Sequence, residues 1–199
     1  MRTYENSRLL SGFGRAVRDK RGIAATEFAL LLPIITLLFF GMLEGSDLFT
    51  VNRRLANATN SLVDLVAQEP TITESELSDV IVGVTRILEP TDTSTVVMKV
   101  VSLTKGSNAG DPVKVHWSRD NKGLTPYPAG STYTKLDDET SLLPDSSILV
   151  VEIDYEYDSG FSGRVFSIPF DFSHSSVRWP RKSSRVQLCA SPDPATCTT

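Results

Sequence analysis

The sequence predicts an α+β protein: a long amino-terminal helix, a second helix, and then a small antiparallel β-sheet. Three observations predict it. An apolar run begins at Ile23 and becomes amphipathic after Leu43, a second helical pattern follows, and alternating strand patterns occupy most of the remainder. The 199 residues suffice for one membrane anchor and one modest globular body. We therefore expect residues 70–199 to fold as a single α+β domain.

A basic segment, residues 1–22, precedes the apolar run. Six basic residues against two acidic ones give it a net charge of +4, which leaves −8 for the rest of the chain. As a helix, the apolar residues 23–43 would measure about 31 Å, the thickness of the hydrocarbon core of a bilayer. The positive-inside rule keeps the basic segment in the cytoplasm. The sequence thus predicts a single-pass inner-membrane protein with an acidic periplasmic body, which disfavours nucleic-acid binding.

The boundary between these segments carries a short motif. Gly22 follows the basic residues RDKR, Ile23 opens the apolar run, and Glu27 is the fifth residue after the glycine. A secretory signal would place its cleavage site after a short apolar run, whereas here the candidate site comes first. The order resembles the type IV prepilin processing signal. The resemblance implies that a prepilin peptidase removes residues 1–22 by cutting between Gly22 and Ile23.

Glu27 is the only charged residue among residues 23–43. A carboxylate within a spanning helix costs up to about 3 kcal/mol and rarely lacks a partner. One interpretation is that Glu27 reaches the cytoplasmic interface. The prepilin resemblance implies another, in which the new amine of Ile23 on one subunit pairs with Glu27 of the next. The charge pair would then set the register of subunit assembly.

Two helical patterns follow the apolar run. The first continues the anchor over residues 44–69 as an amphipathic extension that ends before Pro70, with apolar positions at Leu48, Val51, Leu55, Ala58, Leu62 and Leu65. This stripe packs either on the protein's own domain, which we favour, or in a coiled coil, for which it is short. The second begins with Thr73 and Glu76, a capping-box pattern, and its apolar face comprises Leu77, Val80, Ile81, Val84, Ile87 and Leu88.

Alternating residues predict four strands. Residues 96–103 and 114–117 suggest a hairpin. Residues 151–157 should bury one face and expose the other, with Glu152, Asp154 and Glu156 in water. Residues 165–172 repeat the pattern, and Pro169 places this strand at a sheet edge or beside a bulge. Its inward residues are expected to be Phe166, Ile168, Phe170 and Phe172.

A long connection, residues 120–147, separates the second and third strands. Connections of this length are often functional or disordered. The acidic residues Asp137, Asp138 and Glu139 within it lack the ligand spacing of an EF-hand, so we interpret them as a solvated charge run rather than a Ca²⁺ site.

The two cysteines, Cys189 and Cys197, predict one disulfide, which in an oxidising periplasm would stabilise the body by roughly 2 to 3 kcal/mol. A pair of metal thiolates is the alternative, but neither a further cysteine nor a nearby histidine completes a site. His116 and His174 are expected to be surface residues. Without a recognisable catalytic motif, we expect no enzyme, no metal and no cofactor.

The chain as a whole resembles the TadE-like minor pilins and pseudopilins of tight-adherence (Tad, Flp-type, type IVc) pilus systems. The strongest part is KRGIAATEFALLLPIITLLFFGMLEGSDLF at 20–49. Weaker parts are HWSRDNKG at 116–123, the tyrosine-rich late strand, and VRWPRKSSR at 177–185.

That resemblance implies a pilin-like fold and a non-catalytic role in the assembly, priming or tip of an adhesive pilus. Its implied partners are the prepilin peptidase, major and minor pilins, and the inner-membrane assembly platform, with the cell-surface pilus as a second location. The alternative is an unprocessed, membrane-anchored periplasmic module that binds a secretion-system or envelope partner.

Overall fold

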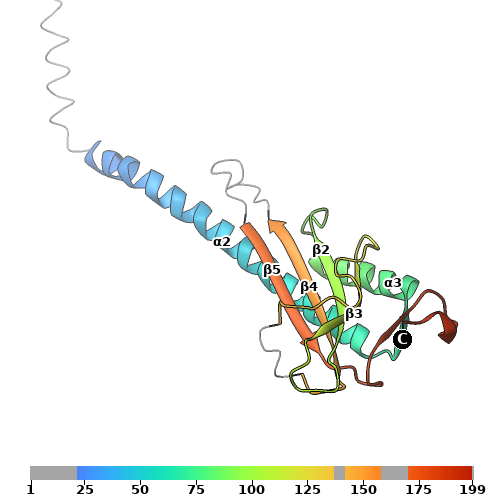
Figure 1. Ribbon diagram of the computed structural model, residues 1–199. Helices are drawn as coiled ribbons and strands as arrows, with labels where there is room; N and C mark the ends of the chain where they lie inside the picture. The colour runs from blue at the N-terminus through green and yellow to red at the C-terminus, as the bar shows by residue number, and fades with distance from the viewer. Residues whose placement is uncertain (1–21, 137–141, 158–169, 199) are drawn as a thin grey trace, which may run out of the picture. The chain divides into compact units, whose positions relative to one another are not determined.

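The computed structural model describes residues 22–136, 142–157 and 170–198. Figure 1 shows its elements, which in chain order are α2 (Ile23–Ala67), β1 (Thr71–Thr73), α3 (Glu74–Thr85), η2 (Arg86–Leu88), β2 (Val97–Thr104), β3 (Lys114–Asp120), β4 (Ser147–Tyr157), β5 (Phe170–Arg178), β6 (Gln187–Cys189) and η4 (Pro194–Thr196). A long apolar helix, a second helix and an antiparallel sheet confirm the predicted α+β fold.

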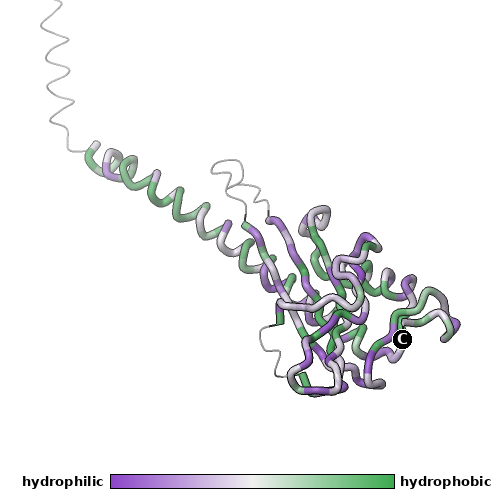
Figure 2. The backbone as a smooth tube through the Cα atoms, viewed as in Figure 1, coloured by the Kyte–Doolittle hydropathy of each residue, from purple (hydrophilic) through white to green (hydrophobic). Residues whose placement is uncertain are grey.

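The chain divides into two compact units, Met1–Ser46 and Asp47–Thr199, and the division falls within α2. The described part of the first unit is the apolar portion of α2, coloured green over most of its length in Figure 2. From Ile23 to Leu43 its side chains are exposed, apart from the half-buried Phe40. The helix ends at Ala67, two residues before the predicted end at residue 69.

The second unit buries the carboxyl-terminal part of α2 against the sheet. Val51, Leu55 and Leu62 are at most 4% exposed and belong to one apolar cluster with sheet residues such as Val151 and Ile153. This confirms that the stripe packs on the protein's own domain. Leu65, however, is 45% exposed, so its predicted place in the stripe is wrong. The buried stripe continues instead through Val63, Val66 and Ala67, because 3.6 residues per turn carry position 65 off the packed face.

Helix α3 begins with the predicted capping box. Thr73 Oγ1 accepts a hydrogen bond from the Glu76 amide at 3.1 Å, and a Glu76 carboxylate oxygen accepts one from the Thr73 amide at 2.8 Å. The predicted apolar face is buried at Leu77, Ile81, Val84 and Leu88 and half-buried at Val80. Ile87 is 38% exposed, contrary to prediction. The chain tightens into the 3₁₀ turn η2 at Arg86, and three residues per turn rotate Ile87 away from the core.

The main sheet has four strands in the order β3-β2-β4-β5, and every neighbouring pair is antiparallel. The predicted hairpin is the pair β2 and β3, with a register shift between Ser102 and Leu103. A second, two-stranded sheet joins β1 to β6 in parallel, and the sequence did not predict it.

Strand β5 lies at the sheet edge, as predicted, but its extent differs from the prediction. It runs from Phe170 to Arg178, so the strand continues six residues beyond its predicted end at Phe172 and includes His174. Phe170 is 41% exposed and not inward, whereas the half-buried Phe172 does pack on the core. Phe166, Ile168 and Pro169 lie outside the described residues.

Both faces of the sheet are covered, which corrects the prediction of one wet face. A second apolar cluster includes Val101, Leu103, Ile148 and Val150 on the face opposite α2, together with Tyr133 and Leu142 from the connection before β4. The connection thus covers the outer face as a packed layer. Its length suggested a functional or disordered loop, but its tyrosine and leucine residues pack on the sheet. Asp137, Asp138 and Glu139 lie outside the described residues.

Candidate functional site

The amino-terminal site predicted from the sequence sits at the start of α2. The helix begins at Ile23, directly after the exposed Gly22. A Cβ atom added to Gly22 would meet nothing within 4 Å, so packing does not require glycine there. The hydroxyl of Thr26 donates a hydrogen bond to the Ile23 carbonyl at 2.8 Å, which holds the first turn together.

Glu27 lies one turn beyond Ile23 and is exposed. Residues four apart on a helix occupy the same face, so Ile23 and Glu27 project on one side of α2. That side is apolar apart from the carboxylate, and it is accessible to another helix. Cleavage after Gly22 and a role of Glu27 in assembly stay predictions.

Helix α2 is the one helix in the described residues that is long and apolar enough to cross a membrane, judged by length and composition. A long apolar helix at the amino terminus indicates membrane anchoring.

A second polar site, which the sequence did not predict, surrounds Glu152 on the outer face of β4. Glu152 is 5% exposed. Its carboxylate accepts hydrogen bonds from the hydroxyl of Tyr133 at 2.6 Å, the hydroxyl of Tyr127 at 2.8 Å and the ammonium group of Lys135 at 3.2 Å. Lys99 on β2 lies 3.7 Å from the same carboxylate. Glu152 thus ties the connection before β4 to the sheet.

Charges around Glu152 are compensated. Burial raises the pKa of Glu152, but hydrogen bonds from Tyr133, Tyr127 and Lys135 outweigh burial, and the net pKa lies below its ordinary value. The hydrogen bond to Tyr127 and the nearby Glu152 raise the pKa of Lys135 to about 12. The site is therefore an ionised network at neutral pH. The alternating pattern at 151–157 hid it, because a buried acid and a solvated acid look alike in sequence.

Asp154, two residues along β4, extends this network toward the sheet edge. Lys99 donates to Asp154 at 2.7 Å and Ser173 of β5 donates at 2.8 Å. Burial raises the pKa of Asp154, yet these hydrogen bonds lower it overall. The network thus joins β2, β4 and β5 on their outer face.

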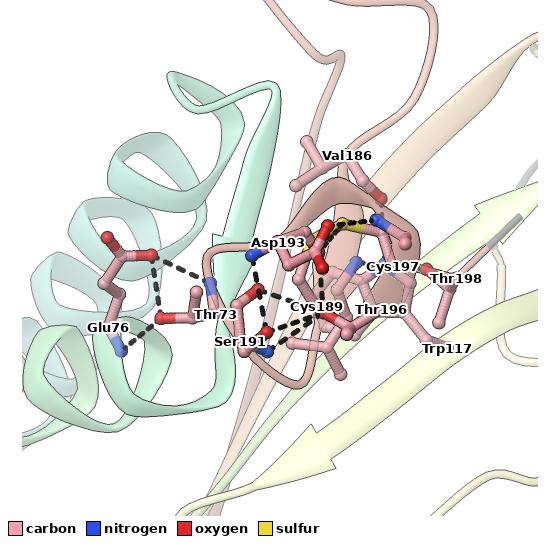
Figure 3. Close-up of a disulfide and its surroundings, with 12 residues drawn as sticks. Thr73, Glu76, Trp117, Val186, Cys189, Ser191, Asp193, Thr196, Cys197 and Thr198 are labelled. Carbon is pink, nitrogen blue, oxygen red and sulfur yellow. Dashed lines mark hydrogen bonds between the residues drawn. A yellow bond between two sulfur atoms is a disulfide. The ribbon is translucent and has the colours of Figure 1, made fainter.

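The carboxyl-terminal site is a loop closed by the predicted disulfide between Cys189 and Cys197. Figure 3 shows this loop beside the start of α3, with hydrogen bonds among Ser191, Asp193 and Thr196. The indole of the buried Trp117 donates to the Val186 carbonyl at 2.8 Å just before β6. The bond from Trp117 therefore fastens the entrance of the loop to the body, and the disulfide closes the loop.

Neither histidine is the surface residue that the sequence predicted, because both are half-buried. His174 Nε2 lies 2.7 Å from Asn52 Oδ1, so it links β5 to α2. His116 lies in β3 between the buried Val115 and Trp117. Within the described ranges, no group of three or more histidine, cysteine, aspartate or glutamate residues is arranged to hold a metal ion.

Comparison with known proteins gives one family. Residues 22–62 match the family model of TadE-like proteins. The matched segment starts at Gly22 and contains Ile23, Glu27 and the whole apolar run. Neither the curated proteins nor the solved structures gave a match. The segment that begins at Gly22 is therefore similar to the TadE-like proteins, as the sequence resemblance predicted.

Proposed function

We propose that this protein is a minor pilin or pseudopilin of a Tad-type type IV pilus, and that a prepilin peptidase cuts it between Gly22 and Ile23. The observation that carries the proposal is the TadE-like match over residues 22–62. The match starts at Gly22 and includes Ile23, Glu27 and the apolar run. A cut at this bond would leave a mature chain that begins with its helix.

In this proposal the apolar part of α2 anchors the chain in the inner membrane until assembly. The basic residues 1–22 face the peptidase in the cytoplasm, and the body from Asp47 onward faces the periplasm. During assembly, the apolar helix passes from lipid to contacts with the helices of major and minor pilins. Its exposed apolar side chains suit both environments.

In this proposal Glu27 sets the axial register between neighbouring subunits. A carboxylate among apolar helices is costly unless it is paired, and cleavage creates one new cation at the amine of Ile23. Pairing between the amine of one subunit and Glu27 of its neighbour satisfies both charges only in one axial register. The proposed role is therefore structural, in assembly, priming or the tip of an adhesive pilus, and it requires no catalysis by this chain.

Processing is tested by expressing the full chain with and without the prepilin peptidase of its pilus system and sequencing the amino terminus. We expect a mature chain that starts at Ile23, and an uncut chain for Gly22→Ala. Gly41→Ala is the matched control, because a Cβ at Gly41, as at Gly22, meets nothing within 4 Å. An intact amino terminus in the presence of the peptidase would instead support an unprocessed membrane-anchored module.

The assembly role is tested with Glu27→Gln, which keeps the shape and removes the charge. We expect normal cleavage of this variant but loss from sheared pili, measured by immunoblot of the pilus fraction. Glu27→Asp, which keeps the charge, should restore part of the incorporation. Normal incorporation of Glu27→Gln would contradict the pairing role while leaving the proposed cleavage intact.

A further inference from the structure

A cavity of about 310 Å³ opens at the end of the sheet where β2 ends and β4 begins. Three basic residues line it, Lys105, Lys114 and Arg185, against one acidic residue, Asp145. The whole chain carries a net charge of −4, so a cavity with a lining charge of +2 departs from the protein's average. The lining therefore favours an anion.

Hydrogen bonds connect the segments that line this cavity. The amide of Lys105 donates to the Ser146 carbonyl at 3.1 Å, and the amide of Asp145 donates to the Gly106 carbonyl at 3.1 Å. These two bonds fasten the segment after β2 to the segment before β4. On the third side, Ser147 Oγ donates to the Ser184 carbonyl at 2.7 Å, which fixes the segment that carries Arg185. Lys114 pairs with Thr104 in the ladder of β2 and β3, so all three cations come from connected segments.

The cations differ in depth. Lys105 is 8% exposed, whereas Lys114 and Arg185 are exposed. A guanidinium group matches the geometry of a phosphate or carboxylate and binds either with two parallel hydrogen bonds.

We propose that this cavity binds a small polar molecule that carries one phosphate or carboxylate group, of the size of an acidic monosaccharide. The volume lies at the low end of about 300 to 1,000 Å³, the usual range for small-molecule pockets. Hydroxyl groups of Thr104 and Ser184 line the wall and suit a polyhydroxylated ligand. Nucleic acids are disfavoured as ligands, because the chain outside residues 1–22 carries a net charge of −8 and repels a long polyanion.

The test is calorimetric titration of the full chain in detergent with glucose 6-phosphate, glucuronate, inorganic phosphate and neutral glucose. We expect one or both acidic sugars to bind at least about tenfold more tightly than glucose, a difference of about 1.4 kcal/mol. The tighter of the two identifies phosphate or carboxylate as the preferred group. Equal binding of glucose would overturn the proposal, as would inorganic phosphate binding as tightly as the better acidic sugar, because the sugar part would then contribute nothing.

Variants tie the binding to this cavity. Lys114→Gln and Arg185→Gln remove exposed charges, so the fold should persist, and each should weaken binding of the acidic sugar about tenfold. Lys122→Gln, an exposed lysine outside the cavity, is the matched control and should not change it.

Asp145→Asn should strengthen binding by removing the one negative charge in the lining. Asparagine tolerates the left-handed backbone at this position, where φ is 56°. Unchanged affinity in both Lys114→Gln and Arg185→Gln, or weaker binding by Asp145→Asn, would place the ligand elsewhere and overturn the proposal.

Discussion

Tyr133 donates a hydrogen bond of 2.6 Å to Glu152, and both residues are at most 5% exposed. The bond joins the connection before β4 to the strand it covers. It lies beside the apolar cluster of Val101, Ile148 and Val150. A buried hydrogen bond and apolar packing therefore both hold the connection before β4 on the sheet.

Replacing Tyr133 by phenylalanine should destabilise the body by about 1.5 to 3 kcal/mol, the usual range for a hydrogen bond to a charged group. The ring would still fill its place, but the buried carboxylate would lose its shortest donor. Urea unfolding of the full chain in detergent, followed by tryptophan fluorescence, measures this change. An unchanged free energy of unfolding would show that Tyr127 and Lys135 suffice to hold Glu152.

The ionised network predicts how stability depends on pH. The pKa of Glu152 and that of Asp154 lie below their ordinary values of 4.5 and 3.8 in the folded state. Their contribution is therefore present above these ordinary values and is lost as pH falls through the lowered folded values. The pKa of Lys135 is raised from 10.5 to about 12, so its contribution is present below 10.5 and is lost as pH rises through about 12. We expect the contribution of this network to stability to be nearly constant between about pH 5 and pH 10.

Glu152→Gln tests how much Glu152 contributes to the loss of stability at acid pH. It should lower stability at neutral pH and flatten the decline below pH 5, because glutamine does not titrate. Glu156→Gln is the matched control on the same strand, since Glu156 is exposed. If stability declines equally below pH 5 in Glu152→Gln and in the unaltered protein, other carboxyl groups govern acid unfolding.

The sequence predicted the helices and strands better than it predicted which polar residues are buried between them. The capping box of Thr73 and Glu76, the hairpin and the disulfide follow from local patterns, which depend on residues close together in the chain. Glu152 does not, because its burial depends on Tyr127 and Tyr133 from a connection without regular periodicity. The cavity beside Lys105 also escaped prediction, since its cations come from three separate segments.

The remaining differences between prediction and structure concern two apolar residues that lie off the buried face of their helix, and the end of one strand. Ile87 is exposed because the helix tightens at Arg86, and Leu65 because the stripe on α2 follows 3.6 residues per turn. Strand β5 extends beyond its predicted end because Ser173 to Arg178 continue the antiparallel pairing with β4. Alternation of polar residues gives no hydrophobic signal, so the sequence alone could not extend the strand.

The disulfide should stabilise the full chain by about 2 to 3 kcal/mol, as expected for closing a short loop. The paired replacement Cys189→Ser and Cys197→Ser removes it. The loop keeps its entrance fixed by the bond from Trp117 to Val186, so we expect loss of stability without loss of the fold. Urea unfolding with and without a thiol reductant measures the difference. A reductant effect that persists in the double serine variant would contradict this assignment.

Replacing two leucines on α2 distinguishes the contribution of core packing to stability from that of helix propensity. Leu62 is fully buried and Leu65 is 45% exposed, although both lie in the last turns of the helix. Leu62→Ala should cost about 2 to 5 kcal/mol because it removes buried methyl groups and leaves a cavity. Leu65→Ala changes the same residue type outside the core and should stay within about 0.5 kcal/mol. Urea unfolding of both variants checks the prediction, and equal losses would show that the carboxyl-terminal part of α2 is not packed on the sheet in solution.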